Sequence, residues 1–381
     1  MKRVFICGAF NFPRGGASSN YVQYFGMALQ ECGYEVHVVT TQNKEYTKSK
    51  YKGMIINEIE YRSGRLKYFL DFNTGAKQAI KCCLKKNSIG EDDIVIVYSH
   101  NLWLHRTVQA YCQKRKIKVG AIVVEYFSCE QFTNKVNYKF YTILTRKVLP
   151  KYDFVFPIST YIEKKLSGGR AKQFVLPIMA DPYEYDNEPK QIGSTRRFIF
   201  LAKDKMKDAL RNTILAIKMV LQESAIDVEF HFCGVKEEII KKNMGISSNV
   251  QLDKRIFIHG WLEYNELVSL YQKMHFLLLP RDTNEMTKAN FPSKVPELMC
   301  YGVIPVASRI GDYTKFYLKD GKNSILMNGC SVEEIKNAIE KSILLNSMTI
   351  SDLSIQAFET TKSKFWYKEW EDRIDSFMKG V

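Results

Sequence analysis

The feature that most constrains the fold is an alternation of short apolar runs with helical patterns, repeated in two blocks of the chain. In the first block, the helical segment 19–33 separates the strand-like runs RVFICGAF (3–10) and YEVHVVTT (34–41). Further strand-like runs lie at 92–99, 119–126, 153–159 and 171–178. Repeated strand–helix–strand units predict a parallel sheet covered by helices on both faces.

The alternation restarts after a polar, proline-containing stretch at 179–195, which has the composition of a domain linker. New strand-like runs, RRFIFLAKD and VEFHFCG, follow it with a helix pattern between them. A length of 381 residues is enough for two domains, each with its own core. We therefore predict an α/β protein with two Rossmann-like, doubly wound domains at 1–185 and 195–361, followed by an amphipathic helical segment at 362–381.

The net charge of +15 indicates either an anionic partner or basic residues spread over the solvated faces of helices. Nucleic acid, anionic lipid headgroups and phosphorylated small molecules each suit a basic protein, and the solvated faces of helices would account for it equally well. No run reaches the roughly 20 apolar residues of a membrane-spanning helix. The nine cysteines form no CxxC pair, so we expect reduced thiols in a cytoplasmic protein and no metal cluster.

Polar and glycine-rich segments lie where strands are expected to end. Gly15 and Gly16 would let backbone approach a ligand beside a new helix N-terminus, although their spacing is neither GxGxxG nor a P-loop. Lys203 and Lys207 would neutralise a diphosphate, and Gly260 would leave room for a flat ring such as a nucleobase. Two facing α/β domains bind ligands at the carboxyl ends of their strands, so we expect the site in the cleft between them.

The segment ANFPSKVPELMCYGVIPVAS (289–308) predicts a helix start followed by a buried strand. Pro292 would preorganise the first turn, and the free amides of Ser293 and Lys294 would then bind phosphate oxygens. Glu297, four residues after Ser293, would lie on the same side of the helix, where a carboxylate can accept hydrogen bonds from a ribose diol. The segment therefore predicts a clamp for a nucleotide sugar.

These segments together resemble glycosyltransferase family 4, a retaining group with the GT-B fold. The resemblance is carried by Gly15-Gly16, by Lys203 and Lys207, by the block HGWL…ELVSLY…FLLLP and by PSKVPELMCYGVIPVAS, and it is strongest from about 196 to 340. It implies a UDP- or GDP-linked sugar donor bound mainly by the second domain, with both lysines facing the donor diphosphate. It also implies an acceptor bound by the first domain, no cofactor or required metal, and a last helix that packs back on the first domain.

One position departs from the family pattern. Glu297 matches the second glutamate of the family's Glu-x7-Glu motif, which the resemblance assigns to the ribose. The first glutamate should stand eight residues earlier, and this chain has Ala289 there. The missing carboxylate would contact the transferred sugar, so Glu285 or Asn290 would have to substitute for it.

The acceptor side is expected in the first domain. The segment VVEYFSCEQF (123–132) matches one that lines the acceptor side in similar enzymes, and Glu125 is the candidate there. His100 and Asn101 also end a strand, at the edge of the sheet where ligands are expected. Retention without a certain nucleophile favours a front-side displacement, in which the donor phosphate takes the proton of the attacking hydroxyl and the enzyme positions and neutralises charge.

The sequence thus predicts a cytoplasmic retaining hexosyltransferase that extends a glycan or a lipid-linked acceptor in cell-surface polysaccharide synthesis. Its basic, aromatic first half suits a peripheral position on the anionic inner face of a membrane. Two alternatives stay open: a sugar-nucleotide epimerase, and a non-catalytic donor-binding subunit that needs a partner. Nucleic acid is the least favoured partner, because no nucleic-acid motif accompanies the charge.

Overall fold

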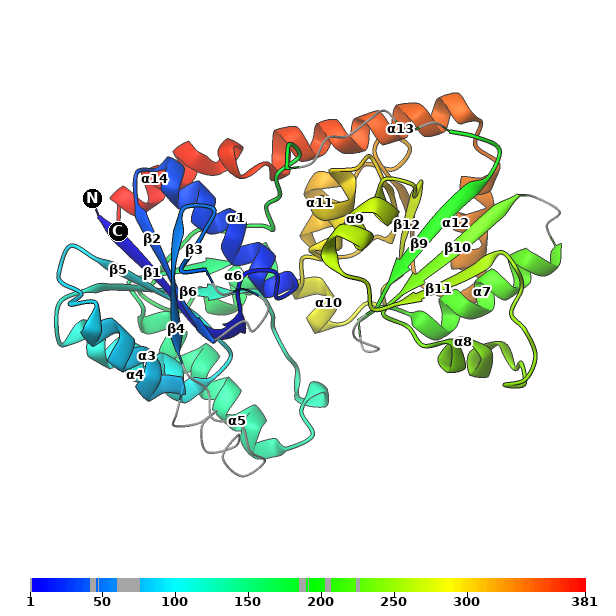
Figure 1. Ribbon diagram of the computed structural model, residues 1–381. Coiled ribbons are helices and arrows are strands. Elements are labelled where there is room, and N and C mark those ends of the chain that lie inside the picture. Colours follow the sequence, from blue (N-terminus) through cyan, green and yellow to red (C-terminus); the bar gives the residue numbers. More distant parts are fainter. Residues whose placement is uncertain are drawn as a thin grey trace. The chain divides into compact units, whose positions relative to one another are not determined.

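The chain forms two compact units. The computed structural model describes residues 2–41, 46, 48–59, 76–184, 190, 192–202, 207–223 and 227–381. Unit 1 comprises Met1–Met179, Ala289–Phe291 and Tyr367–Val381, and unit 2 comprises Ala180–Lys288 and Pro292–Trp366. Each unit is built on one sheet (Figure 1).

The sheet of unit 1 has eight strands in the order β3-β4-β2-β1-β5-β6-β7-β8, and the pairs are parallel except for β3 with β4. The strands are β1 (Arg3–Asn11), β2 (Glu35–Thr41), β3 (Lys50–Tyr51), β4 (Met54–Ile59), β5 (Ile94–Tyr98), β6 (Lys118–Val123), β7 (Phe154–Pro157) and β8 (Lys172–Gln173). Strands β5 and β7 are buried over almost their whole length and β1 is buried from Val4 to Gly8, as in a parallel sheet with both faces covered.

Helices cover both faces of this sheet. Helices α1 and α14 pack together, and α3 and α4 pack together on the opposite face (Figure 1). The helices of unit 1 are α1 (Ala17–Glu31), α3 (Ala76–Lys86), α4 (Leu102–Gln113), α5 (Lys135–Ile143), α6 (Thr160–Leu166) and α14 (Glu371–Lys379), with short turns at Cys129–Gln131, Leu144–Val148, Leu149–Lys151 and Tyr367–Trp370.

The end of the chain belongs to the core of unit 1. Phe377 of α14 stacks on Phe174, with ring centroids 5.2 Å apart, and meets the edge of Phe156 at 5.4 Å. The sequence predicts one amphipathic helix over 362–378, and the structure divides that stretch. The helical turn ends at Phe365, because the backbone of Trp366 is extended and forms a bridge with Ala180.

The sheet of unit 2 has six parallel strands in the order β11-β10-β9-β12-β13-β14. They are β9 (Arg196–Leu201), β10 (Val228–Cys233), β11 (Ile256–Gly260), β12 (Phe276–Leu279), β13 (Ile304–Ser308) and β14 (Ile325–Met327). The rings of Phe230 and Phe276 stack on Phe198 from the two neighbouring strands, with centroids 5.3 and 4.9 Å away. This row of rings forms the centre of the core of unit 2.

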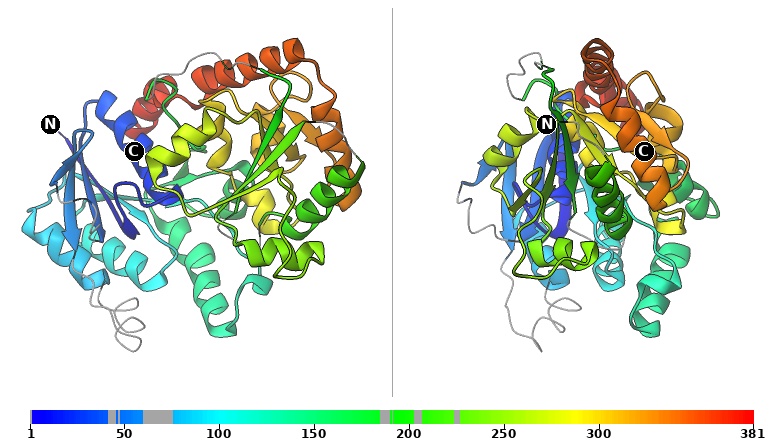
Figure 2. Two further views of the ribbon diagram at one scale, coloured as in Figure 1. Left: turned by 45° about the vertical axis from the view of Figure 1, so that its right-hand side comes forward. Right: turned by 90° about the vertical axis from the view of Figure 1, so that its right-hand side faces the viewer.

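Helices of unit 2 form two groups. Helix α7 packs against α8 and α12, whereas α11 packs against α13, and Figures 1 and 2 show them around the sheet. The helices are α7 (Leu210–Glu223), α8 (Glu237–Met244), α9 (Tyr264–Tyr271), α10 (Glu285–Ala289), α11 (Lys294–Met299), α12 (Val332–Ile343) and α13 (Ser347–Thr360), with π-turns at Tyr313–Tyr317 and Thr361–Phe365. Among the residues that the structure describes, no helix combines the length and the apolar character needed to cross a membrane.

Candidate functional site

A buried ionic cluster lies at the carboxyl ends of the strands of unit 2. The Asp208 carboxylate accepts from Arg281 Nε at 2.8 Å and from Lys294 Nζ at 2.6 Å. The Asp208 and Arg281 side chains are only 5% and 3% exposed, so both charges are shielded from water. Burial alone would raise the pKa of Asp208, but the charges of Lys294 and Arg281 outweigh it and the pKa is lowered. This carboxylate is therefore ionised and committed to its two cations.

Strand ends and loops hold this cluster in place. Arg281 follows β12, and its backbone N–H donates to Ser308 Oγ at the end of β13 at 2.9 Å. Ser308 in turn donates to the Gly329 carbonyl at 2.8 Å. Lys294 Nζ also donates to the Leu201 carbonyl at the end of β9. Three neighbouring strands are thus tied together at the edge where a doubly wound sheet binds its ligands.

Glu297 lies one turn into α11, beside this cluster. Burial raises the pKa of its carboxyl from 4.5 to about 7, although a hydrogen bond from Tyr271 and the charge of Lys294 lower it and Glu184 raises it further. Near neutral pH the group is therefore divided between its neutral and ionised forms. A carboxyl with a pKa in this range, close to other charges, is a candidate for binding or catalysis.

The start of α11 differs in detail from the sequence prediction. The helix begins at Lys294 with Ser293 as its N-cap, so Pro292 precedes the helix instead of forming its first turn. The Lys294 side chain forms an ion pair with Asp208. Its ammonium group is therefore already engaged and is not available as a separate phosphate ligand. Glu297 N donates to the Ser293 carbonyl at 3.3 Å, and among the described residues no acceptor is assigned to the N–H groups of Ser293 and Lys294.

The predicted diphosphate lysines are only partly described. Lys203 lies outside the described residues. Lys207 is half-buried in the turn directly before Asp208, at the carboxyl edge of the sheet. Gly260 ends β11 with φ of 59°, in the left-handed region that favours glycine, and its carbonyl accepts from Gly234 N at 2.6 Å. Space around a side chain at position 260 is open, so the glycine serves the backbone conformation.

The position of the missing motif carboxylate is fully buried. Ala289 is 0% exposed and ends the short helix α10, and its carbonyl accepts from the buried Ser159 Oγ at 2.7 Å. Glu285 lies four residues earlier on α10, hence on the same face of the helix, and is half-buried. Asn290 follows directly and is also half-buried. Of the two substitutes predicted from the sequence, only Glu285 keeps a carboxylate on the Ala289 face.

In unit 1, the glycine pair forms the junction between β1 and α1. A Cβ atom on Gly15 would lie 2.1 Å from the Asn11 carbonyl oxygen, so only glycine fits there. Gly16 is the N-cap of α1, with φ of 86° and open space around it. The N-terminus of α1 therefore has no hydrogen bond from the side chain of its cap residue, and binding of a ligand there stays a prediction.

The structure brings two of the predicted acceptor residues together. His100 follows β5 and Glu125 follows β6, and His100 Nε2 lies 3.6 Å from Glu125 Oε2. The imidazole also meets the edge of the Phe127 ring, with centroids 5.5 Å apart. The His100 side chain is 43% exposed, so the pair is open to a ligand. A histidine beside a carboxylate at a strand end can bind or polarise a hydroxyl group.

Asn101, the third predicted residue, has a structural contact. Its side-chain oxygen accepts from Leu104 N at 2.9 Å and thereby caps α4. Its neighbour His105 is fully buried, with ring nitrogens 2.8 Å from Tyr152 Oη and from the Ser99 carbonyl. Burial lowers the pKa of His105 to about 4, so it is a neutral residue that holds the 99–101 turn in place.

Sequence reasoning missed the residues that build the edge of unit 2, namely Asp208, Arg281 and Tyr271. A signal was present for two of them, because Arg281 directly follows FLLLP and Asp208 directly follows Lys207, both at predicted strand ends. No sequence signal indicated that Tyr271, at the end of α9, would reach Glu297. Within the described ranges, no three His, Cys, Asp or Glu side chains are grouped so as to hold a metal ion.

Comparisons with known proteins find similarity in part of the sequence and in the fold. Residues 195–344 match the family model described as glycosyl transferases group 1. No curated protein matches the sequence.

Several solved glycosyltransferase structures share the architecture. Sucrose-phosphate synthase from Thermosynechococcus elongatus is 12% identical, with a TM-score of 0.75 over 100% of this chain and 99% of that one. HepE from Anabaena, in complex with UDP and glucose, is 12% identical, with a TM-score of 0.74 over 100% of both chains. Trehalose-6-phosphate synthase OtsA is 10% identical, with a TM-score of 0.74 over 100% of this chain and 99% of that one. At these identities the likeness concerns the fold, and the predicted GT-B architecture of two parallel-sheet α/β domains is confirmed.

Proposed function

We propose that the protein is a retaining glycosyltransferase of the hexosyltransferase type. In this proposal unit 2 binds a nucleotide-sugar donor, and unit 1 binds a glycan or lipid-linked acceptor of cell-surface polysaccharide synthesis. The observation that carries the proposal is the charged edge of unit 2, which lies inside the segment that matches the group 1 glycosyltransferase model.

The donor side is argued from Glu297. A carboxylate that accepts hydrogen bonds from both hydroxyls of a ribose diol is favoured when it is ionised. Lys207, beside Asp208, and Lys203 would offset the negative charge of the diphosphate. Asp208 keeps the Lys294 and Arg281 side chains occupied, so the edge is rigid before the donor binds. HepE has been solved with UDP and with UDP-glucose, which makes UDP-sugars the first donors to test, with GDP-sugars next.

The reaction proposed is a front-side displacement. The acceptor hydroxyl oxygen forms a bond to the anomeric carbon on the face that the donor phosphate leaves. The bond from the anomeric carbon to the phosphate oxygen breaks, and that oxygen takes the hydroxyl proton. The products are a glycoside with retained configuration and a nucleoside diphosphate. The chain's own contribution is positioning and charge stabilisation by Lys203, Lys207 and Glu297.

The acceptor side is argued from the pair His100 and Glu125 at the carboxyl ends of β5 and β6. Their partial exposure allows hydrogen bonds to a sugar hydroxyl, and the nearby Phe127 ring offers an apolar face to the ring of a sugar. A lipid-linked acceptor would bring the protein to the anionic face of a membrane, for which its charge of +15 is suited.

Ala289 favours a second candidate function. A fully buried alanine stands where the family resemblance implies a carboxylate on the transferred sugar. The chain would then bind a donor without transferring its sugar and would need a catalytic partner. Glu285 distinguishes the two functions: if it replaces the missing carboxylate, Glu285→Gln abolishes transfer while nucleotide binding persists.

The experiment is a thermal-unfolding panel with UDP-, GDP-, ADP- and dTDP-sugars. The proposal expects a selective rise in melting temperature with one base, lost in Glu297→Ala and kept in the control Glu340→Ala on α12. Release of nucleoside diphosphate in the presence of oligosaccharide and polyprenyl-phosphate acceptors then tests transfer. If no nucleotide raises the melting temperature, the donor-site proposal is wrong. If nucleotides bind and no acceptor supports release, the non-catalytic candidate is favoured.

A further inference from the structure

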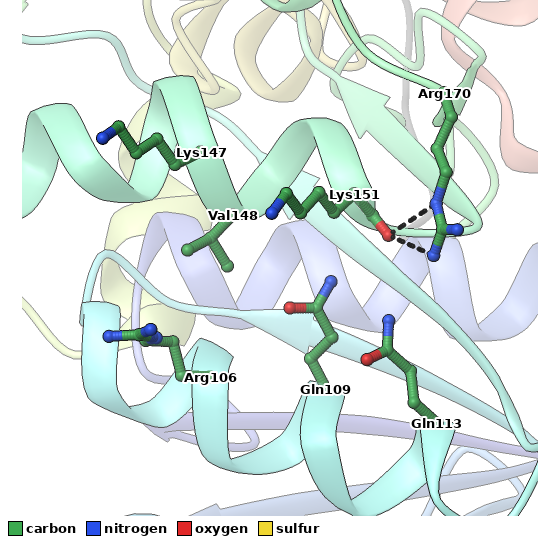
Figure 3. Close-up of a pocket in the computed structure, with 7 residues that line it drawn as sticks. All are labelled: Arg106, Gln109, Gln113, Lys147, Val148, Lys151 and Arg170. Atoms are coloured by element: carbon green, nitrogen blue, oxygen red, sulfur yellow. Dashed lines mark hydrogen bonds between the residues drawn. The ribbon is translucent and has the colours of Figure 1, made fainter.

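Unit 1 holds a cavity of about 560 Å³ that the proposed reaction does not use (Figure 3). Helix α4 forms one wall with Arg106, Gln109 and Gln113. The turns Leu144–Val148 and Leu149–Lys151 form the other wall, and Arg170 stands at one end. The α4 residues are spaced three and four apart, so they lie on one face of the helix and converge on the cavity.

The cavity extends toward the opposite edge of the sheet from His100 and Glu125. Those two residues follow the carboxyl ends of β5 and β6, whereas Lys151 and Arg170 precede the amino ends of β7 and β8. Because these strands are parallel, residues before the strands and residues after them lie at opposite edges. The cavity is therefore separate from the acceptor side.

The residues that line the cavity carry positive charges and no negative ones. Four of the seven lining residues are cations, namely Arg106, Lys147, Lys151 and Arg170, and none is acidic. Within the described part of the chain, none of these four side chains pairs with a carboxylate. All four are exposed, so their charges reach the cavity at little desolvation cost. Clustered like charges repel one another, and an anion bound among them relieves that repulsion.

The floor of the cavity carries an unpartnered donor. Gln109 is 8% exposed, and its Nε2 is buried without a hydrogen-bond partner. Figure 3 shows the Gln109 amide standing between α4 and the turn that carries Lys151. A buried amide without an acceptor costs stability, so its presence beside four cations indicates an acceptor group supplied by a ligand.

Arg170 is held at the cavity by the backbone around it. Its Nε and Nη2 donate to the Lys151 carbonyl at 3.2 and 3.0 Å, and its backbone N–H donates to the Pro150 carbonyl at 2.9 Å. A Cβ atom on Gly169 would lie 2.2 Å from Pro150, so only glycine allows this close approach. The guanidinium is thus placed before any ligand arrives, as expected of a preorganised anion site.

We propose that this cavity is a second anion site, which takes a phosphate-bearing group. Phosphate oxygens match both the fixed guanidinium and the lysine ammonium groups, and the Gln109 amide would donate to one of them. The volume exceeds that of a single phosphate, so the phosphate belongs to a larger molecule, either a soluble phosphorylated compound or a phospholipid headgroup. This site is independent of the proposed transferase reaction.

The test compares Lys147→Gln/Lys151→Gln with the matched double Lys85→Gln/Lys86→Gln, which removes the same charge from the exposed end of α3. Binding of pyrophosphate and inorganic phosphate to the full chain is measured by calorimetry. Flotation is measured with vesicles of phosphatidylcholine with and without phosphatidic acid. Two lost charge-assisted hydrogen bonds at exposed side chains predict about tenfold or greater weakening in the cavity variant and little change in the control. Soluble-anion binding that is lost in this way identifies a phosphorylated compound, and vesicle binding that is lost identifies a headgroup.

Equal weakening in both double variants would show a response to net charge alone and would overturn the proposal, as would the absence of binding to every probe. A second variant, Gln109→Leu, removes the buried amide while keeping all four cations. The proposal expects it to weaken the same binding and leave folding stability equal or higher, because an unpartnered polar group is lost. Unchanged affinity in Gln109→Leu would contradict a site in which the buried amide binds the phosphate.

Discussion

The two units present polar residues at the carboxyl edges of their sheets in different ways. In unit 2, Asp208 is buried between Arg281 and Lys294, and Glu297 is held in surroundings that raise its pKa to about 7. In unit 1, His100 and Glu125 stand 3.6 Å apart with the imidazole 43% exposed, and the turn at Gly15-Gly16 is open. The charged residues at the edge of unit 2 are therefore buried, whereas those at the edge of unit 1 are exposed to solvent.

This difference matches two kinds of binding task. A buried ionic cluster fixes the geometry of neighbouring strands, which suits a ligand with constant parts such as a nucleoside diphosphate. An exposed pair at the ends of two strands can change partners with little cost to folding, which suits ligands that vary. The part of the chain that matches the group 1 glycosyltransferase model, residues 195–344, contains the buried edge.

The largest expected effect is on the buried edge. Asp208→Asn leaves Arg281 and Lys294 without their shared counter-charge, and breaking a buried ion pair in this way costs about 3–5 kcal/mol of folding free energy. Urea unfolding measures the loss. The control Glu237→Gln removes one partner of the exposed pair with Lys241 and should cost less than about 1 kcal/mol. A similar loss of folding free energy in both variants would show that the Asp208 cluster contributes no more than a solvent-exposed ion pair.

The next effect is a gain in stability. The Glu297 pKa is about 7 in the folded chain and near 4.5 when unfolded, so the native state keeps a proton that the unfolded state has lost between these values. Folding stability therefore falls as pH rises from about 4.5 to 7. Glu297→Gln removes this penalty and should stabilise the protein by about 2 kcal/mol at pH 8, allowing for partial exposure, with no gain at pH 4. Denaturant unfolding at pH 4 and pH 8 checks the prediction. A gain in folding free energy that is equal at the two pH values would contradict it.

A backbone change tests the open turn of unit 1. In Gly15→Ala the new methyl group meets the Asn11 carbonyl, and the strain should cost about 1–3 kcal/mol. Gly90→Ala is the matched control, because a Cβ atom there meets nothing within 4 Å and the change should stay within about 0.5 kcal/mol. Thermal unfolding compares the two. A neutral Gly15→Ala would mean that the turn adapts and that glycine is not required for its shape.

The smallest effect on folding is expected at the exposed pair. Glu125→Gln should change the folding free energy by less than about 1 kcal/mol, because the contact between Glu125 and His100 is open to water. Its effect should appear in transfer instead, as a lower rate with unchanged nucleotide affinity. Kinetics and nucleotide titration on the same sample separate these quantities. Weakened nucleotide binding in Glu125→Gln would contradict the assignment of this pair to the acceptor.

The alternation of strand and helix patterns was enough to predict the fold, because a parallel sheet covered on both faces requires long apolar strands at regular intervals. It also located the strand ends at which Gly15, His100 and Glu125 lie. The break at Trp366 was not predictable, since it depends on a pairing with Ala180, far away in the sequence.

The candidate site was predicted only in part for the same reason. Glu297 was identified from its position in a motif, but its raised pKa arises from burial and from Tyr271, Lys294 and Glu184, which come from separate elements. The sequence suggested that Lys294 would stand at a helix start near phosphate. Its ion pair with Asp208 depends on a loop 86 residues away, and no local pattern encodes that contact.

The most direct test is the pH dependence of nucleotide binding. The nucleoside diphosphate identified by the thermal panel is titrated calorimetrically against the wild-type chain and Glu297→Gln at pH 6, 7 and 8. If the ionised carboxylate binds the ribose, its fraction rises about tenfold from pH 6 to 8, and the wild-type affinity should rise about tenfold relative to the variant. Parallel pH profiles with equal affinities in the two proteins would contradict a donor site built around Glu297.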